Sequence, residues 1–380
     1  MNYQARASGH VYFFLDREDT QERTLVKVDQ LALEVFWGAP DRTKQRIVGM
    51  RDEERLPSNI HYHLDHLTVV QDEFGDVIRL GDGDEVTDVP HPAAPGSDTI
   101  YAFRLADSLS IRLAGRSEPI RVYEVQVRPR HVDRPGFVGS VFLERGSAAI
   151  VRMSFTFTPA SYVDARLDYI RITLDNALWE GRYWLPNEQK LEIRRQYPGL
   201  DFPAGAVIRG DLRIRDYVFN QDLPASFFRG AAVVAYPESM REAFPFEEGL
   251  YAGLEDEGLA TPPELERLRQ TARELVGERY LSGLPRVRLY APDASSVLRW
   301  NRAEGLVVGA GLAYAPGPTS RIALFGGYGF GRERAHGLLT LGHARPGWGG
   351  GLRLYRERMR DLGPLPGAPR ALNTVHALFG

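Results

Sequence analysis

The sequence predicts an all-β protein: a large curved antiparallel sheet shaped like half a barrel, a short helical connector, and the first strands of an incomplete antiparallel membrane β-barrel. Three observations predict it. Residues 1–235 alternate apolar and polar side chains with period two, as antiparallel strands do. Residues 296–380 form short apolar segments dotted with glycine. The 38 glycines and 25 prolines suit many turns better than many helices.

Four segments of the first 235 residues show the alternation. On each, we expect the apolar residues to share a buried face and the intervening ones, such as Glu124 and Gln126, to face water. The predicted buried sets are Leu31, Leu33, Val35 and Trp37; Tyr123, Val125 and Val127; Val151, Met153, Phe155 and Phe157; and Ile170, Ile172 and Leu174.

Turn residues separate these segments, as expected for a chain of hairpins. Because no regular helices intervene, a doubly wound α/β fold is excluded and a meander is favoured. The clearest turns are Ala39-Pro40-Asp41, Gly81-Asp82-Gly83-Asp84, Arg134-Pro135-Gly136, Arg145-Gly146-Ser147 and Glu180-Gly181.

Residues 236–295 read as a connector with one helix, over about 262–281. Thr261 is a suitable N-cap, prolines follow in the first turn, and Glu264 occupies the third position. An apolar stripe at helical spacing continues the pattern: Leu265, Leu268, Ala272, Leu275 and Val276.

Residues 296–380 are predicted to be part of an outer-membrane β-barrel. Apolar rows run along the expected strands, with small residues opposite them. Four strands do not close a barrel, and no export signal follows Met1, so we expect the chain to be a fragment. The rows are Leu306, Val308, Ala310, Leu312 and Tyr314; Ile322, Leu324, Gly326, Tyr328 and Phe330; and, more weakly, Leu352, Leu354 and Arg356.

Composition excludes several classes of function. The net charge is −3 and no basic stripe is interleaved with aromatic residues, so no nucleic-acid partner is expected. Cysteine is absent, which excludes disulfides and thiolate chemistry. No apolar run is long enough for a transmembrane helix.

Two clusters in the sequence contain residue types that bind metal ions. On a strand, His61, His63 and Asp65 would point the same way, but a polar strand face is the simpler interpretation of His61–His66. The acidic stretch 81–88 lacks the spacing of a calcium loop and reads as a hairpin turn. No catalytic, cofactor-binding or metal-binding residue is assigned, no cofactor is expected, and the chain is predicted not to be an enzyme.

Several strings resemble a family of uncharacterised bacterial outer-membrane proteins. They are Tyr123–Arg130, Gly139–Arg145, Ala149–Met153, Trp184-Leu185-Pro186 with Gln189, and Trp300-Asn301-Arg302-Ala303-Glu304-Gly305. In that family, a periplasmic β-domain similar to periplasmic lipoprotein carriers precedes a C-terminal membrane barrel. The resemblance covers roughly residues 120–220 and 260–330, and it implies an antiparallel periplasmic β-domain at 1–235 and a partial outer-membrane barrel at 296–380. It carries over no catalytic residues.

The resemblance implies an outer-membrane protein whose periplasmic domain binds a lipid, lipoprotein or envelope partner. The residues expected to line an apolar concave face are Tyr12, Phe14, Trp37, Phe155 and Phe157. Two alternatives stay open: a metal-dependent hydrolase using the His61–His66 region, and a soluble β-sandwich adhesion or binding module.

Overall fold

The prediction of an all-β protein is confirmed. The computed structural model describes residues 2–17, 22–40, 42–54, 75–80, 84–111, 119–201, 204–252, 282–301, 304–317, 320–345 and 348–356. Within these ranges the chain forms two large sheets and one separate hairpin, and neither large sheet is closed into a barrel.

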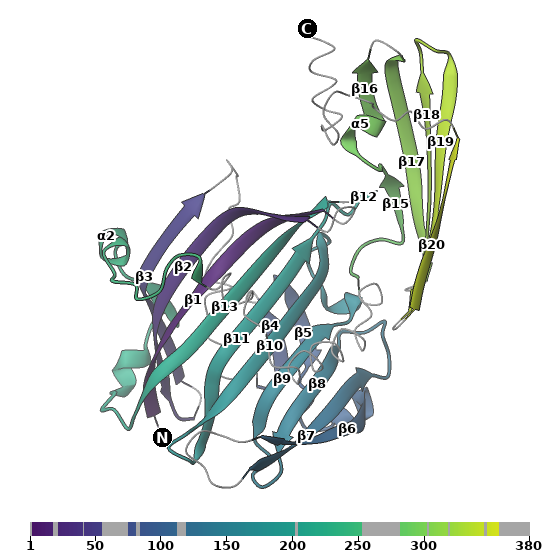
Figure 1. The fold of residues 1–380 in the computed structure, drawn as a ribbon. Helices are drawn as coiled ribbons and strands as arrows, with labels where there is room; N and C mark the ends of the chain where they lie inside the picture. Colours follow the sequence, from purple (N-terminus) through teal and green to yellow (C-terminus); the bar gives the residue numbers. More distant parts are fainter. Residues whose placement is uncertain are drawn as a thin grey trace.

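The first sheet has eleven strands and is strongly curved (Figure 1). Every neighbouring pair is antiparallel except β14 and β3, which are parallel. Its spatial order is β14 (Val233–Ala235), β3 (Arg42–Glu54), β2 (Glu22–Gly38), β1 (Asn2–Arg17), β13 (Ala204–Phe219), β11 (Tyr183–Arg195), β10 (Leu167–Trp179), β9 (Ile150–Phe157), β8 (Phe137–Glu144), β7 (Ile120–Pro129) and β6 (Tyr101–Ile111).

The inner face of this sheet carries the main hydrophobic core. A two-stranded hairpin, β4 (Val77–Leu80) and β5 (Val86–Pro90), packs into it through Ile78, Val86 and Val89. In Figure 1 the hairpin lies behind β10 and β11, inside the curve of the sheet. The β4–β5 hairpin therefore covers the core along this part of the sheet.

The turn between β10 and β11 shows how local sequence fixes the hairpins. Glu180 and Gly181 both have positive φ, 49° and 65°, and Arg182 N–H donates to the Trp179 carbonyl at 3.0 Å. These are the features of a type I′ turn, whose twist matches that of the strands it joins. The predicted Glu180-Gly181 turn is confirmed.

The outer face of β1–β3 is covered by the chain that follows β13. Phe227, in the short helix η4 (Ala225–Phe228), packs edge-on against Phe36 with ring centroids 4.8 Å apart. Leu250 and Tyr251 pack against a second cluster formed by Tyr12, Phe14, Val28 and Val207. Both faces of this part of the sheet are therefore buried.

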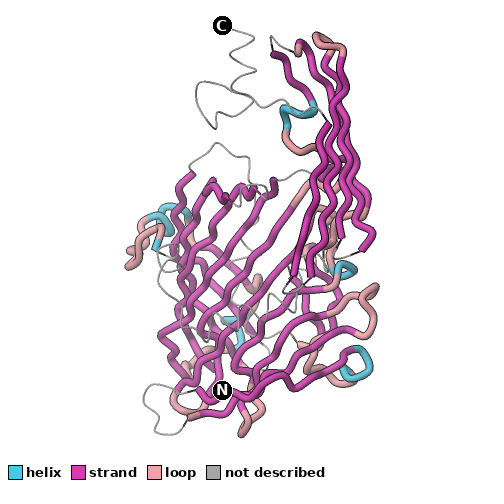
Figure 2. The backbone as a smooth tube through the Cα atoms, turned by 45° about the vertical axis from the view of Figure 1, so that its right-hand side comes forward, coloured by secondary structure: helices cyan, strands magenta, loops and turns pink. Residues whose placement is uncertain are grey.

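The second sheet contains β12 (Leu200–Asp201), β15 (Val287–Tyr290), β17 (Gly305–Gly317), β18 (Ser320–Gly329), β19 (Arg334–Arg345) and β20 (Trp348–Arg356), in that order, with β16 (Leu298–Asn301) also paired to β17. It projects from the rim of the first sheet (Figures 1 and 2). Strand β15 precedes residue 296, where the predicted barrel region begins, and β12 comes from the β11–β13 connection. The predicted division at residues 235 and 295 stays a prediction.

Two details of the alternation are wrong. The register of β8 and β9 shifts between Phe142 and Leu143, so Val151 packs on the outer face, away from Met153. The face of β7 that was expected to meet solvent is also buried, since Glu124 and Gln126 are 5% and 4% exposed. Glu124 accepts a hydrogen bond from Ser140 at 2.7 Å, and Gln126 accepts one from Arg104 at 3.0 Å. Partnered polar side chains can be buried without a large penalty.

Helices are few and short in the described ranges. They include α1 (Ser97–Ile100), α2 (Glu238–Glu242), α5 (Ala294–Val297) and the 3-10 turn η3 (Pro159–Ser161). The helix predicted at about 262–281 lies outside the described residues. Across the described part of the chain, no helix has the length and apolarity needed to cross a membrane.

Candidate functional site

The strongest candidate site is one face of the second sheet, where large apolar side chains point into solvent. Leu324 at the centre of β18 is 60% exposed, and Leu312 on β17 and Leu354 on β20 are each 52% exposed. Isolated exposed leucines are ordinary on protein surfaces, but contiguous patches mark interaction sites. Whether these three leucines belong to one patch depends on the register of their strands.

Strand register makes them adjacent. Leu289, Leu312, Leu324, Leu339 and Leu354 stand directly opposite one another on five successive strands. Directly opposed residues of antiparallel strands lie on the same face, about 5 Å apart. A second row runs beside the first: Val287, Tyr314, Ile322, Leu341 and Leu352.

A third row, Leu298, Val308, Tyr328 and Ala335, continues the same surface toward the β18–β19 turn. We call the three rows, together with the exposed Leu306 at the next position on the same face of β17, the apolar face. Along β17 it extends from Leu306 to Tyr314, which corresponds to about 27 Å of strand. That length matches an outer-membrane strand, whose lipid-facing band is about 25 Å tall.

The opposite face of the second sheet is built from small residues and a few large ones that lie over them. A Cβ added at Gly309 would stand 2.4 Å from the Phe325 ring, and one at Gly311 would stand 2.5 Å from the Leu324 carbonyl oxygen. Phe325 itself is only 3% exposed and packs with Tyr290, Ala313 and Ala323. Glycine at these two positions leaves room for the Phe325 ring and for the close approach of neighbouring backbone.

Ion pairs of the second sheet lie on the face opposite the apolar face. Arg288 and Arg321 lie on the opposite face and bind Asp201, at 3.2 and 2.8 Å. Arg299 pairs with Glu304 at 2.8 Å, also on the opposite side. Arg356, at the end of β20, is in register with the apolar face.

Asp201 joins the two sheets. It belongs to the two-residue strand β12, which leaves the end of β11 and pairs in parallel with β15. The residue is 5% exposed and holds two arginines from different strands of the second sheet. Arg288 also donates to Gln196 at 2.9 Å, so the junction has several polar contacts.

The residues expected to line one concave apolar face do not share a face. Trp37, Phe155 and Phe157 belong to the inner core, but Tyr12 and Phe14 belong to the cluster on the outer side. Their neighbours on β1, Val11 and Phe13, belong to the inner core. The prediction of a single lining set is therefore wrong, because β1 is apolar on both sides and Tyr12 and Phe14 lie on its outer side.

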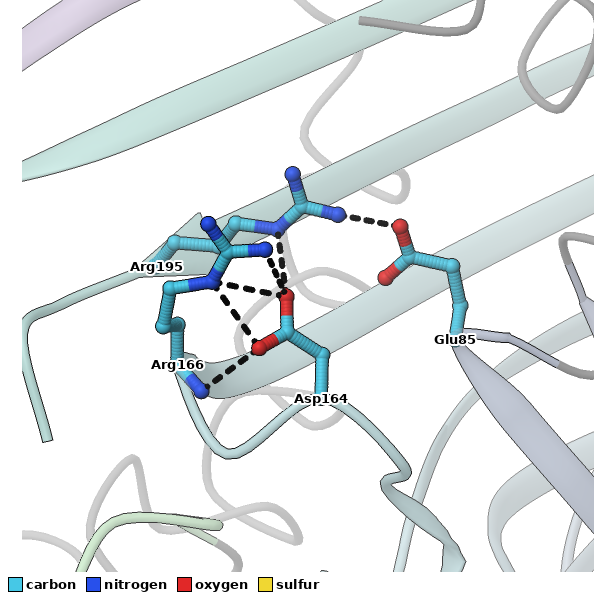
Figure 3. Close-up of polar contacts among 4 residues, drawn as sticks. All are labelled: Glu85, Asp164, Arg166 and Arg195. Atoms are coloured by element: carbon cyan, nitrogen blue, oxygen red, sulfur yellow. Dashed lines mark hydrogen bonds and ion pairs between the residues drawn. The ribbon is translucent and has the colours of Figure 1, made fainter.

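A polar cluster fastens the inner hairpin to the rim of the first sheet (Figure 3). Arg195, at the end of β11, binds Glu85 next to β5, and its Nε lies 3.8 Å from Asp164 Oδ2. Arg166 donates to both oxygens of Asp164, at 2.9 and 3.0 Å. Figure 3 shows the two carboxylates and two guanidinium groups as one connected network.

The electrostatics of this cluster favour a structural role. Burial raises the pKa of Asp164, but hydrogen bonds from Arg166 outweigh that effect and leave the pKa below its ordinary value. A carboxylate held in this way accepts protons poorly near neutral pH. The cluster therefore suits fastening better than acid–base catalysis.

The two metal hypotheses have different outcomes. The His61–His66 cluster lies outside the described residues, as do Gly81–Gly83. The strands on either side of this acidic stretch, β4 and β5, pair with each other in antiparallel orientation. In the parts of the chain that the structure describes, no group of three or more His, Cys, Asp or Glu residues is placed to hold a metal ion.

The sequence predicts the apolar rows but not the ion pairs formed by Asp201 and by Glu85. Asp201, Arg288 and Arg321 are far apart in the sequence, and nothing in their local surroundings predicts that they meet. The same holds for Glu85 and Arg195, which are 110 positions apart.

Comparisons with known proteins give little beyond this geometry. No protein-family model matches the chain, and no curated protein matches it. A solved domain from Vibrio parahaemolyticus, provisionally described as an outer membrane lipoprotein-sorting protein domain, is 11% identical; the alignment covers 59% of this chain and 89% of that one, with a TM-score of 0.25. OpdO of Pseudomonas aeruginosa is 8% identical over 90% of this chain and 86% of its own, with a TM-score of 0.11. Neither similarity carries an argument about this chain.

Proposed function

We propose that this chain is a non-enzymatic outer-membrane protein: the second sheet contacts lipid, and the first sheet forms a periplasmic domain that binds a lipid, lipoprotein or envelope partner. The observation that carries the proposal is the apolar face. The apolar face extends over six strands and is as long as a membrane-crossing strand. The opposite face of the same sheet contains many small residues. Lipid hydrocarbon is the partner whose chemistry such a face fits.

The absence of cysteine allows a direct test. A single cysteine is introduced at Leu324 in the full chain and labelled with an environment-sensitive fluorophore. The matched control carries the cysteine at Leu105, which is 63% exposed on β6 of the first sheet, against 60% for Leu324. The chains are refolded from urea with phospholipid vesicles that do or do not contain a brominated lipid quencher.

We expect the Leu324 label to shift to the blue with vesicles and to be quenched by brominated lipid, and the Leu105 label to respond to neither. A Leu324 label that stays in water at every lipid concentration would refute the proposal. A label shielded without lipid, more strongly as the protein concentration rises, would instead favour association between copies and the soluble binding-module alternative.

Location needs its own test. With an export signal fused before Met1 and expression in a Gram-negative bacterium, we expect the chain to fractionate with the outer membrane. Residues 1–235 should be reached by protease only after the outer membrane is permeabilised. Recovery in the soluble periplasm would contradict this location.

The proposed ligand role of the first sheet is most consistent with its inner face. An acyl chain there would be stabilised by about 0.8 kcal/mol for each buried CH₂ group. Because Ile78, Val86 and Val89 of the inner hairpin already occupy this face, a ligand would have to displace them. The Glu85–Arg195 pair opposes that displacement, so Glu85→Gln should increase binding of a fluorescent fatty acid; unchanged binding would place the ligand elsewhere.

A further inference from the structure

One end of the apolar face carries a distinct group of aromatic residues. Tyr328 and Phe330 meet edge to face with ring centroids 5.2 Å apart, and both are exposed, at 40% and 58%. Trp300 stands directly opposite Leu306, and Phe330 N–H donates to the Leu306 carbonyl at 2.9 Å. Trp300, Leu306 and Phe330 therefore form a row across three strands at this end of the sheet.

Three arginines lie at the same end of the second sheet. Arg332, in the β18–β19 turn, and Arg334, which begins β19 opposite Gly329 on the other face of the sheet, are both exposed. Arg356, at the end of β20, is exposed and stands opposite Gly337 on the apolar face. We call Trp300, Tyr328, Phe330, Arg332, Arg334 and Arg356 the collar.

The turn that carries Phe330 and Arg332 is held in place by backbone hydrogen bonds. Gly331 N–H donates to the Glu304 carbonyl at 2.7 Å, beside the Phe330–Leu306 bond. A Cβ at Gly331 would stand 2.7 Å from that carbonyl oxygen, so the close approach requires glycine. The Glu304 side chain is bound by Arg299, so this nearby carboxylate is already neutralised.

The other end of the apolar face also carries an exposed aromatic residue, Tyr314 at 45%, but its polar groups differ. There Ser320 Oγ and His343 Nδ1 are 2.9 Å apart, and Arg321 is bound to Asp201 at 2.8 Å. The first sheet joins the second at this end, through β12 and β15, whereas the β18–β19 turn lies at the far end in Figure 1. The two ends are thus chemically distinct along the direction in which lipid would be crossed.

We infer that the collar is a docking site for the phosphate-bearing headgroups of an anionic lipid layer. The inference rests on the proposed lipid contact of the second sheet and deepens it. Tyrosine and tryptophan favour the boundary between hydrocarbon and headgroups, and arginine binds phosphate oxygens there with a planar, two-pronged donor set. The collar places both kinds of side chain where the apolar face ends, so it sets which end of the sheet lies in an anionic leaflet.

The test uses the full chain and vesicles of two compositions, pure phosphatidylcholine and phosphatidylcholine with phosphatidylglycerol. Partitioning is measured by flotation after refolding from urea. One variant combines Arg332→Gln, Arg334→Gln and Arg356→Gln. The matched control combines Arg121→Gln, Arg128→Gln and Arg130→Gln, three exposed arginines at the two ends of β7, so both variants lose the same charge.

The wild type should prefer the anionic vesicles, and each collar arginine should contribute about fivefold, or about 1 kcal/mol. The collar variant should lose at least tenfold of that preference and bind pure phosphatidylcholine as the wild type does, while the control changes by less than twofold. A collar variant that keeps the preference overturns the inference and leaves the lipid contact intact. A wild type that binds neither vesicle overturns the lipid contact and, with it, the inference.

Discussion

The two sheets use the same alternation of side chains for opposite purposes. In the first sheet the large apolar residues are buried, under the inner hairpin on one face and under residues 225–251 on the other. In the second sheet the large residues of the apolar face are exposed, and the opposite face combines small residues with the buried Phe325 and Tyr290. Alternation therefore predicts a strand with two different faces, and in the second sheet the sizes of the residues on each face follow which face is exposed.

The largest expected contrast comes from truncating one phenylalanine in each sheet. Phe157 is fully buried in the first core, and Phe157→Ala should lower the free energy of unfolding by about 3–5 kcal/mol. Phe330 is 58% exposed, and Phe330→Ala should change it by less than about 0.5 kcal/mol without lipid. Urea denaturation followed by circular dichroism measures both. Equal losses would mean that Phe330 is covered in the lipid-free protein, which would remove the contrast between the sheets.

A second pair of substitutions tests the two faces of the second sheet. A Cβ at Gly309 would meet both the Phe325 ring and the Ser296 carbonyl oxygen, at 2.4 and 2.7 Å, so Gly309→Val should cost about 1–3 kcal/mol. Gly326 has nothing within 4 Å of its Cβ position, and Gly326→Val should be neutral or slightly stabilising. Thermal unfolding in detergent compares them. A destabilised Gly326→Val would show that this face is covered by protein.

Some features of the fold can be predicted from the sequence, and others cannot. The alternating apolar sets and the Glu180-Gly181 turn follow from local sequence, because strand period and turn geometry are local properties. The burial of Tyr12 and Phe14 on the outer face is not a local property, because it depends on residues 250 and 251, which pack over them. Val151 lies on the other face because of a register shift between β8 and β9, which depends on the pairing partner. The Asp201 junction depends on contacts between strands that are far apart in the sequence.

A smaller contrast separates two acidic side chains near the inner hairpin. Glu85 is bound by Arg195, with side-chain exposures of 12% and 19%, whereas Asp88 meets Arg79 at 3.4 Å with exposures of 68% and 60%. Removing one partner of a largely buried pair leaves a charge poorly solvated, so Glu85→Gln should cost about 1–2 kcal/mol. Asp88→Asn should cost less than about 0.5 kcal/mol. Chemical denaturation distinguishes them, and equal effects would show that the rim cluster does not fasten the hairpin.

The smallest expected effect concerns pH and the covered outer face of the first sheet. Burial lowers the pKa of His10, although the backbone carbonyl of Gly249, 3.1 Å from Nε2, and the carboxylate of Glu248 partly oppose the shift. The unfolded chain, with its histidine near 6.5, then binds a proton that the folded chain resists. Stability should therefore fall as the pH drops from about 7 through 6.5 toward the lowered value, by about 1 kcal/mol or less.

His10→Gln keeps a side-chain amide near Gly249 but cannot titrate, so this part of the pH dependence should disappear. Unfolding midpoints between pH 7.5 and 5, measured for the wild type and the variant, give the difference directly. Parallel pH profiles would mean that His10 is reached by water, and that residues 248–251 do not cover this face as they do in the structure. The first sheet would then be open on one side, and the difference between the two sheets would be one of degree.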